Sequence, residues 1–286
     1  METDAKAVNA SRHRHRRRGL ALAALLTAAP AAAESNDHAT QVARGRYLVE
    51  QVMACAACHS PRGPEAAARH LSGGSRAIET EGYTVHAGNI TPDAATGIGA
   101  WSDAEIAAAI RKGRGRDGRP LAPEMPSAFY ASLADADVGA VVAYLRIVPP
   151  VANAMPAPAY RAPVAGETWP RADAPGPAAT PAERGAYLAA VAYCMNCHGR
   201  DADDALRLET PGAGGHVLRG PWGAVATPAL AGAALVDWTD AELDAALAKG
   251  VGRDGAAFIP PMNRARFYGG MTAQDRSDLI AWLRSL

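Results

Sequence analysis

The four cysteines of the chain occur as two pairs, and a histidine directly follows each pair. The first motif is Cys55-Ala56-Ala57-Cys58-His59, and the second is Cys194-Met195-Asn196-Cys197-His198. Thiols at this spacing could close a disulfide, bind a zinc ion or bond covalently to a porphyrin. The three chemistries make different demands on the rest of the chain.

A disulfide and a zinc site each leave part of the pattern unexplained. A disulfide in each pair gives the histidines no role, and a thioredoxin-like pair also requires a βαβ unit that is not predicted here. Zinc suits the spacing within a pair, but the pairs lie 139 residues apart in separate repeats. One shared ion would give each repeat half a site, so we keep both chemistries only as alternatives.

Haem attachment accounts for all six residues. In a helical turn, cysteines at i and i+3 share a face, so both sulfurs can bond to the vinyl-derived carbons of one macrocycle. The next residue, His59 or His198, can then bring its imidazole to the iron as the proximal ligand, and CxxCH is the attachment signature of c-type haem. We predict two covalently attached haem c groups. The predicted attachment residues are Cys55, Cys58, Cys194 and Cys197.

A sixth iron ligand must come from elsewhere in each half, and methionine and histidine are the common choices. Met125 and Met262 each follow a matching tryptophan by 24 residues, in proline-containing loops that can hold a weak ligand in place. We predict them as distal ligands, with core filling as the alternative role. The rival methionines are Met53 and Met195, which flank the cysteines, Met155 in the linker, and Met271, whose rough counterpart is Ser132. The remaining histidines, His70, His86 and His216, have no partner in the other half.

These motifs belong to an internal repeat that must position them. ARGRYLVEQVMACAACH (43–59) matches ERGAYLAAVAYCMNCH (183–198), and WSDAEIAAAIRKGRGRDG (101–118) matches WTDAELDAALAKGVGRDG (238–255). Apolar residues recur at helical spacing in both halves, which predicts helices. Start signals are Ser102 with Glu105, Thr239 with Glu242, Ser132 with Asp135 and Thr272 with Asp275, and Gly113 and Gly250 are predicted ends.

Each half also places a glycine inside its first predicted helix, at Gly45 and Gly185. Glycine costs about 1 kcal/mol relative to alanine there. A close crossing with the last helix would offset this cost, with Tyr144 or Trp282 against the glycine. A merely tolerated glycine is the alternative.

Nine prolines between residues 147 and 183 predict an extended linker. The predicted organisation is a signal peptide (1–33), a first domain (38–148), a Pro/Ala-rich linker (149–180) and a second domain (181–286).

The N-terminus predicts export. SRHRHRRR (11–18) precedes an apolar run (19–29) and three alanines, which is the order of a signal peptide cleaved after Ala33. A nucleic-acid-binding arm has no need of the apolar segment, and an uncleaved anchor would need about 20 apolar residues. Without residues 1–33, the chain has 23 basic and 27 acidic residues. We expect a periplasmic protein with no nucleic-acid partner and no integral membrane span, which could associate with a membrane through a partner.

One run of residues resembles a known family. AGNITPD (87–93), then TGIG (96–99) and WSDAE (101–105), is similar to the motif run of the cytochrome c subunits of periplasmic alcohol, aldehyde and sugar-acid dehydrogenases. The resemblance implies an all-α fold of two tandem class I cytochrome c domains with His/Met ligation. Many members carry three haems, whereas this chain has two CxxCH motifs, and its second half has only Ala226-Thr227-Pro228 in place of the Asn-Ile-Thr-Pro run.

The resemblance further implies a carrier that takes electrons from a periplasmic dehydrogenase and passes them to a downstream cytochrome or oxidase of the respiratory chain. A dihaem enzyme of the peroxidase or thiosulfate-oxidising type, with one open iron, is the rival. A third hypothesis is a structural protein in which the haems take no part in electron transfer. Trp101 and Trp238 are candidate donors to haem propionates, with core packing as the alternative.

Overall fold

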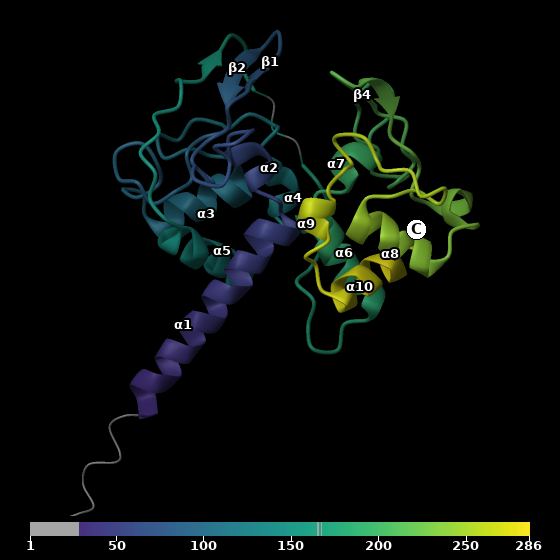
Figure 1. The fold of residues 1–286 in the computed structure, drawn as a ribbon, viewed down its shortest axis with the longest axis horizontal. Helices are drawn as coiled ribbons and strands as arrows, with labels where there is room; N and C mark the ends of the chain where they lie inside the picture. The colour runs from purple at the N-terminus through teal and green to yellow at the C-terminus, as the bar shows by residue number, and fades with distance from the viewer. Residues whose placement is uncertain (1–28, 165, 167) are drawn as a thin grey trace, which may run out of the picture. The chain divides into compact units, whose positions relative to one another are not determined.

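A computed structural model describes residues 29–164, 166 and 168–286, and residues 40–286 form one compact unit (Figure 1). The predicted signal peptide lies almost wholly outside the described residues. The helices are α1 (Ala29–Tyr47), α2 (Ala56–His59), α3 (Asp103–Lys112), α4 (Ser127–Tyr130), α5 (Asp135–Ile147), α6 (Pro181–Val191), α7 (Met195–His198), α8 (Asp240–Lys249), α9 (Ala265–Tyr268) and α10 (Ala273–Leu283). A π-helical turn, η1 (Leu48–Val52), follows α1, and a 3-10 turn, η2 (Gly232–Leu235), precedes α8.

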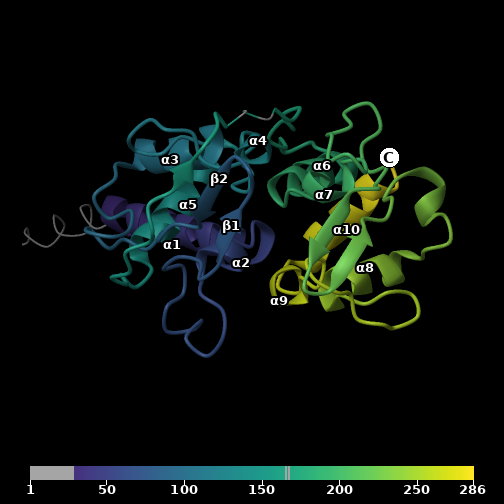
Figure 2. The same cartoon turned by 90° about the horizontal axis from the view of Figure 1, so that it is seen from above.

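The two repeats fold into two lobes with the same order of helices (Figures 1 and 2). We call residues 40–148 the first lobe and residues 181–286 the second lobe. In each lobe a first helix leads into the CxxCH turn, and three further helices follow. This is the succession α2, α3, α4 and α5 in the first lobe and α7, α8, α9 and α10 in the second. The predicted limits of the domains stay predictions.

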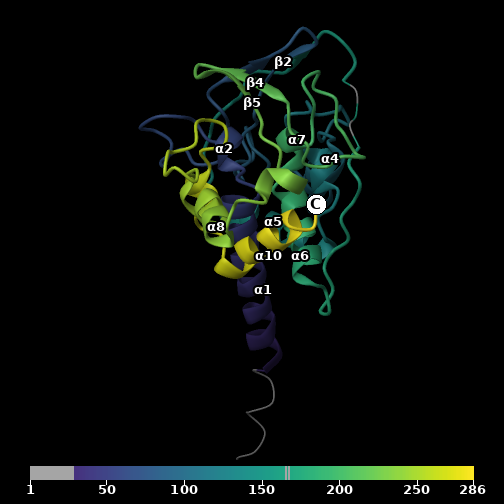
Figure 3. The same ribbon diagram turned by 90° about the vertical axis from the view of Figure 1, so that its right-hand side faces the viewer.

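Both predicted glycine crossings are confirmed. A Cβ on Gly45 would lie 1.8 Å from the Ala140 carbonyl oxygen, and one on Gly185 would lie 2.0 Å from that of Asp278. Tyr144 and Trp282 pack against the same glycines, as predicted. Figure 3 shows α6 beside α10, where the second crossing occurs. Because glycine has no side chain, the first helix and the last helix of each lobe can approach each other closely at this position.

Most of the predicted helix signals are confirmed. Ser102 and Thr239 form capping boxes at the starts of α3 and α8. Gly113 and Gly250 end these helices in the left-handed conformation that glycine adopts without strain. The prediction for Ser132 was wrong: α5 starts after Ala134 without a side-chain cap, and the Ser132 hydroxyl instead accepts a hydrogen bond from the Ala172 backbone.

The all-α prediction omits two small antiparallel sheets. Strands β1 (Ala77–Glu79), β2 (Tyr83–His86) and β3 (Ala159–Tyr160) form one, and β4 (Val217–Gly220) and β5 (Gly223–Ala226) form the other. Strands of two to four residues are too short to display an alternating pattern. Since β3 lies in the linker and pairs with β2, the linker packs along the first lobe. Trp169 of the linker also stacks on Phe129, with the ring centroids 4.9 Å apart.

The lobes share one apolar core. Leu48 and Val141 of the first lobe and Leu188 and Leu279 of the second belong to the same buried cluster. Within the described residues, no helix is both long enough and apolar enough to cross a membrane.

Candidate cofactor sites

Each CxxCH motif forms a single helical turn, with the first cysteine just before the helix and the histidine at its end. The residue before the first cysteine has left-handed backbone angles in both lobes: φ is 52° at Ala54 and 46° at Tyr193. Such angles cost a non-glycine residue roughly 1 kcal/mol or more. Because both lobes adopt them, this turn is part of how the chain presents the cysteines.

The thiols do not have the surroundings of a reactive pair or a zinc site. All four are unpaired, and burial raises the pKa of Cys55 to about 12 and that of Cys194 to about 11. A redox-active pair needs a lowered pKa instead. Among the described residues, no group of three or more His, Cys, Asp or Glu side chains is placed to hold a metal ion, as a shared zinc site would require.

The two histidines are oriented as proximal ligands must be. Nδ1 of His59 lies 2.8 Å from the carbonyl oxygen of Gly88, and Nδ1 of His198 lies 2.9 Å from that of Pro228. A carbonyl can only accept, so Nδ1 carries the proton and Nε2 keeps a lone pair for a metal. Burial lowers the pKa of both imidazoles, which favours this neutral form. The residues present therefore fit a haem iron in each lobe.

The motif that suggested the family resemblance holds the carbonyl that His59 contacts. The buried Asn89 side chain accepts from the Thr91 amide at 3.0 Å and donates to the Val151 carbonyl at 2.8 Å, which fixes the loop directly after Gly88. The second lobe has no such asparagine. There the Thr227 hydroxyl, next to Pro228, donates to the Cys197 carbonyl at 3.2 Å. Different residues thus produce the same histidine contact.

Met125 and Met262 occupy equivalent turns before α4 and α9. The Met125 amide donates to Ala122 at 3.0 Å, and the Met262 amide donates to Ile259 at 3.1 Å. Both side chains are half-buried. Their role as distal ligands stays a prediction.

A tyrosine after each methionine ties its loop to the CxxCH segment of the same lobe. The Tyr130 hydroxyl donates to the Met53 carbonyl at 3.5 Å, and the Tyr268 hydroxyl donates to the Ala192 carbonyl at 3.3 Å. Met53 and Ala192 both stand two residues before the first cysteine of their motif. The methionine loop and the cysteine turn are therefore fixed to each other in each lobe.

The other candidate side chains have different partners. Met53, Met195 and Met271 fill the core, with exposed fractions of 1%, 2% and 3%. His70 pairs with Glu50 at 2.7 Å, and His216 lies 3.3 Å from Asp204.

The tryptophan carbonyls tie the last helix of each lobe to the start of α3 or α8. The Trp101 carbonyl accepts a hydrogen bond from Arg146 in the last turn of α5, and the Trp238 carbonyl accepts one from Arg284, directly after α10. The role proposed for the two indole groups stays a prediction.

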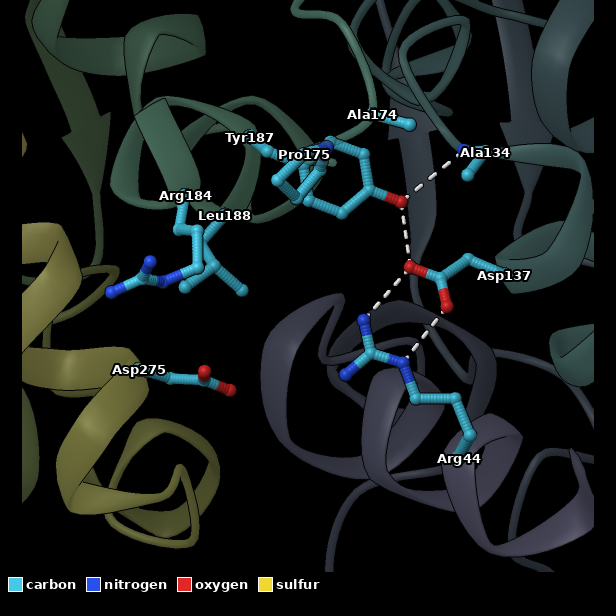
Figure 4. A pocket seen from close by; sticks show the side chains of 9 residues that line it. All are labelled: Arg44, Ala134, Asp137, Ala174, Pro175, Arg184, Tyr187, Leu188 and Asp275. Atoms are coloured by element: carbon cyan, nitrogen blue, oxygen red, sulfur yellow. Dashed lines mark hydrogen bonds and ion pairs between the residues drawn. The ribbon is translucent and has the colours of Figure 1, made fainter. Parts of the chain in front are cut away.

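Each lobe contributes a tyrosine that contacts an aspartate of the other lobe, and the sequence analysis missed both contacts. The Tyr187 hydroxyl donates to Asp137 at 2.6 Å and accepts from the Ala134 amide at 3.2 Å (Figure 4). In the opposite direction, the Tyr47 hydroxyl contacts Asp275 and accepts from the Thr272 amide. Equivalent residues of the repeat make both contacts, so a two-fold relation joins the lobes.

A cavity of about 310 Å³ opens beside this junction, lined by Arg44 and Asp137 of the first lobe and by Arg184 and Tyr187 of the second. Arg44 donates twice to Asp137, at 2.8 Å each, as Figure 4 shows. Tyr47, Tyr187, Asp137 and Asp275 stand at matching positions of the repeat, and this was the available signal for the contact.

Comparison with known proteins identifies the repeat. The family model described as Cytochrome c matches residues 42–149 and 182–286. A nicotinate dehydrogenase subunit of Pseudomonas putida is 39% identical over 154 residues, which cover 51% of this chain and 12% of that protein. The gluconate 2-dehydrogenase cytochrome c subunit of Pantoea cypripedii is 39% identical over 136 residues, 47% of this chain and 29% of the relative.

A further relative, the diheme cytochrome c-type protein of Cereibacter sphaeroides, is 30% identical over 155 residues. The aligned part covers 50% of this chain and 52% of that protein. The chain therefore spans about half, or less, of the length of these relatives.

Proposed function

Because the chain belongs to the cytochrome c family, we propose that it is a periplasmic dihaem cytochrome c that carries electrons from a dehydrogenase toward the respiratory chain. The observation that carries this proposal is the repeated histidine contact. In both lobes a CxxCH turn presents an imidazole whose Nδ1 is bonded to a carbonyl, and among the described residues no hydrogen bond is recorded for its Nε2. Two such sites, each within its own family match, support one haem c in each lobe.

Each group of residues has an assigned role at these sites. Cys55 and Cys58, like Cys194 and Cys197, would hold the cofactor through thioether bonds. His59 and His198 would ligate its iron, and Met125 and Met262 would supply the further ligands. Haem c supplies one-electron redox chemistry when bound, while the chain holds it, excludes water and limits reorganisation of the ligands.

The relatives support the choice of partner. Two of them are named as subunits of dehydrogenases that act on nicotinate and gluconate. A dehydrogenase of this general kind is therefore the proposed donor, and a downstream cytochrome or oxidase is the proposed acceptor. The basic segment and apolar run at residues 11–29 support export to the periplasm, where the two partners would be met.

A reduction assay tests this proposal. The tagged protein is purified from the periplasm of a bacterium that matures c-type cytochromes, together with any dehydrogenase that accompanies it. Gluconate, nicotinate and ethanol are then added separately to the oxidised preparation. We expect one substrate to produce the sharp visible bands of ferrous haem c, and we expect the protein freed of its companion to show none. Recovery from the cytoplasm alone, or bands that never appear with an active dehydrogenase present, would contradict the proposal.

A further inference from the structure

Four side chains lie between the two CxxCH turns, and we call them the interlobe cluster: Tyr130, Tyr193, Tyr268 and Arg264. The Tyr130 and Tyr193 rings meet edge to face, with centroids 6.0 Å apart and an interplanar angle of 85°. One terminal nitrogen of Arg264 donates to the Tyr193 hydroxyl at 2.8 Å. The guanidinium lies 5.1 Å from the centre of the Tyr193 ring and 5.9 Å from that of Tyr268.

The cluster borders the cysteines of both lobes. Tyr193 stands directly before Cys194 of the second lobe, and the Tyr130 hydroxyl donates to the carbonyl of Met53, two residues before the CxxCH motif of the first lobe. Arg264 donates to the Tyr193 hydroxyl, and the Tyr193 ring meets the Tyr130 ring. The Arg264 charge therefore lies near the CxxCH turns of both lobes.

Two members of the cluster have no counterpart in the first lobe. Tyr193 stands directly before Cys194, where the first lobe has Ala54 before Cys55. Arg264 stands two residues after Met262, where the first lobe has Ser127 two residues after Met125. The first lobe folds in the same way without them, so the repeated fold does not require this pair.

Arg264 also differs from the other arginines at the lobe junction. Arg44 and Arg184 each pair with a carboxylate, Asp137 or Asp278. Within the described residues, the hydrogen bond recorded for the Arg264 guanidinium goes to the neutral Tyr193 hydroxyl. A half-buried positive charge that no carboxylate offsets acts on its surroundings over a longer range than a paired one.

We propose that Arg264 is a positioning residue for electron transfer, which holds the Tyr193 ring between the two haem sites and raises the reduction potential of both. This inference rests on the proposed function, because it requires haem in both lobes. Reduction transfers one electron from the donor to a ferric iron and removes one positive charge from that site. A fixed positive charge nearby therefore favours the reduced state.

Optical redox titration of the two-haem protein tests the inference. In Arg264→Gln, which removes the charge, we expect the equilibrium constant for reduction to fall roughly tenfold at both haems, or about 59 mV. Arg264→Lys keeps the charge and should stay close to wild type. Arg266→Gln is the matched control: it removes an arginine from α9, the short helix that Arg264 directly precedes, but Arg266 is exposed and its guanidinium lies over Phe267.

Haem content is measured on the same samples, so that failure of the Arg264 inference can be distinguished from failure of the proposed function. Two haems with unchanged potentials in Arg264→Gln, a shift at one haem only, or an equal shift in Arg266→Gln would overturn the inference and leave the proposed function standing. A wild-type protein without haem would overturn both. If Arg264→Gln does not mature, Arg264→Met replaces it. Failure of both neutral variants beside a mature Arg264→Lys would mark Arg264 as a folding residue and refute the inference.

Discussion

Replacing Tyr187 by phenylalanine removes one hydroxyl from the junction between the lobes and should destabilise the whole protein. Tyr187 is 2% exposed, so water cannot take the place of the lost group. Its hydroxyl donates to the Asp137 carboxylate and accepts from the Ala134 amide at the start of α5. A hydrogen bond to a charged group contributes about 1.5–3 kcal/mol, and a buried donor left without a partner costs about 1–3 kcal/mol.

The two effects do not add fully, because Arg44 still pairs with Asp137 after the change. We therefore expect Tyr187→Phe to lower the free energy of unfolding by about 3 kcal/mol. Tyr47→Phe removes the equivalent hydroxyl at a half-buried position, so we expect a loss of about 1 kcal/mol.

Urea unfolding of the haem-loaded protein measures these losses. Tyr160→Phe is the matched control, because within the described residues no hydrogen bond is recorded for the Tyr160 hydroxyl, and its ring lies near Tyr83. The control should change stability by less than about 0.5 kcal/mol. A Tyr187→Phe variant no less stable than the control would refute the two-fold junction described here. A loss confined to one lobe would do the same, since the junction joins both.

Three other changes test the packing, the charges and the methionine loops. Gly45→Ala should cost several kcal/mol in urea unfolding, because its Cβ would overlap the Ala140 carbonyl, whereas Gly176→Ala, with open space, should be neutral or slightly stabilising. Burial alone would raise the pKa of Asp137, but hydrogen bonds from Arg44 and Tyr187 hold it below its usual value. Its contribution is therefore present above the unfolded pKa of about 3.9 and is lost as the pH falls through the folded pKa. The stability gap between wild type and Asp137→Asn should accordingly shrink in acid, and a gap independent of pH would contradict this. Met262→Ala should lower the potential of the second-lobe haem and leave the first unchanged, while Met271→Ala, a core substitution, should alter stability and neither potential.

The sequence alone predicted several local features that the two halves share. Two such features are the capping boxes at Ser102 and Thr239 and the close helix crossings at Gly45 and Gly185. Their sequence signals involve a few neighbouring residues and occur in both halves. The family match over both halves confirms the cytochrome c resemblance.

The missed features depend on long-range contacts. The strands β1 to β5 are too short for a periodic signal, and Ser132 bonds to linker residue Ala172 instead of capping a helix. The contact of Tyr187 with Asp137 appears only when the lobes are folded together, although its residues repeat. Tyr193 and Arg264 were missed because they have no counterpart in the first half, and a comparison of the halves therefore does not point to them.

The central claim is that each lobe holds its own haem c through its own CxxCH turn. Intact mass spectrometry of protein exported from a cell with cytochrome maturation tests it directly. We predict a wild-type mass with two added haems, and a mass with one added haem for both Cys55→Ala/Cys58→Ala and Cys194→Ala/Cys197→Ala. A wild-type mass equal to the bare polypeptide, or the loss of both haems from either double variant with its fold intact, would contradict the account.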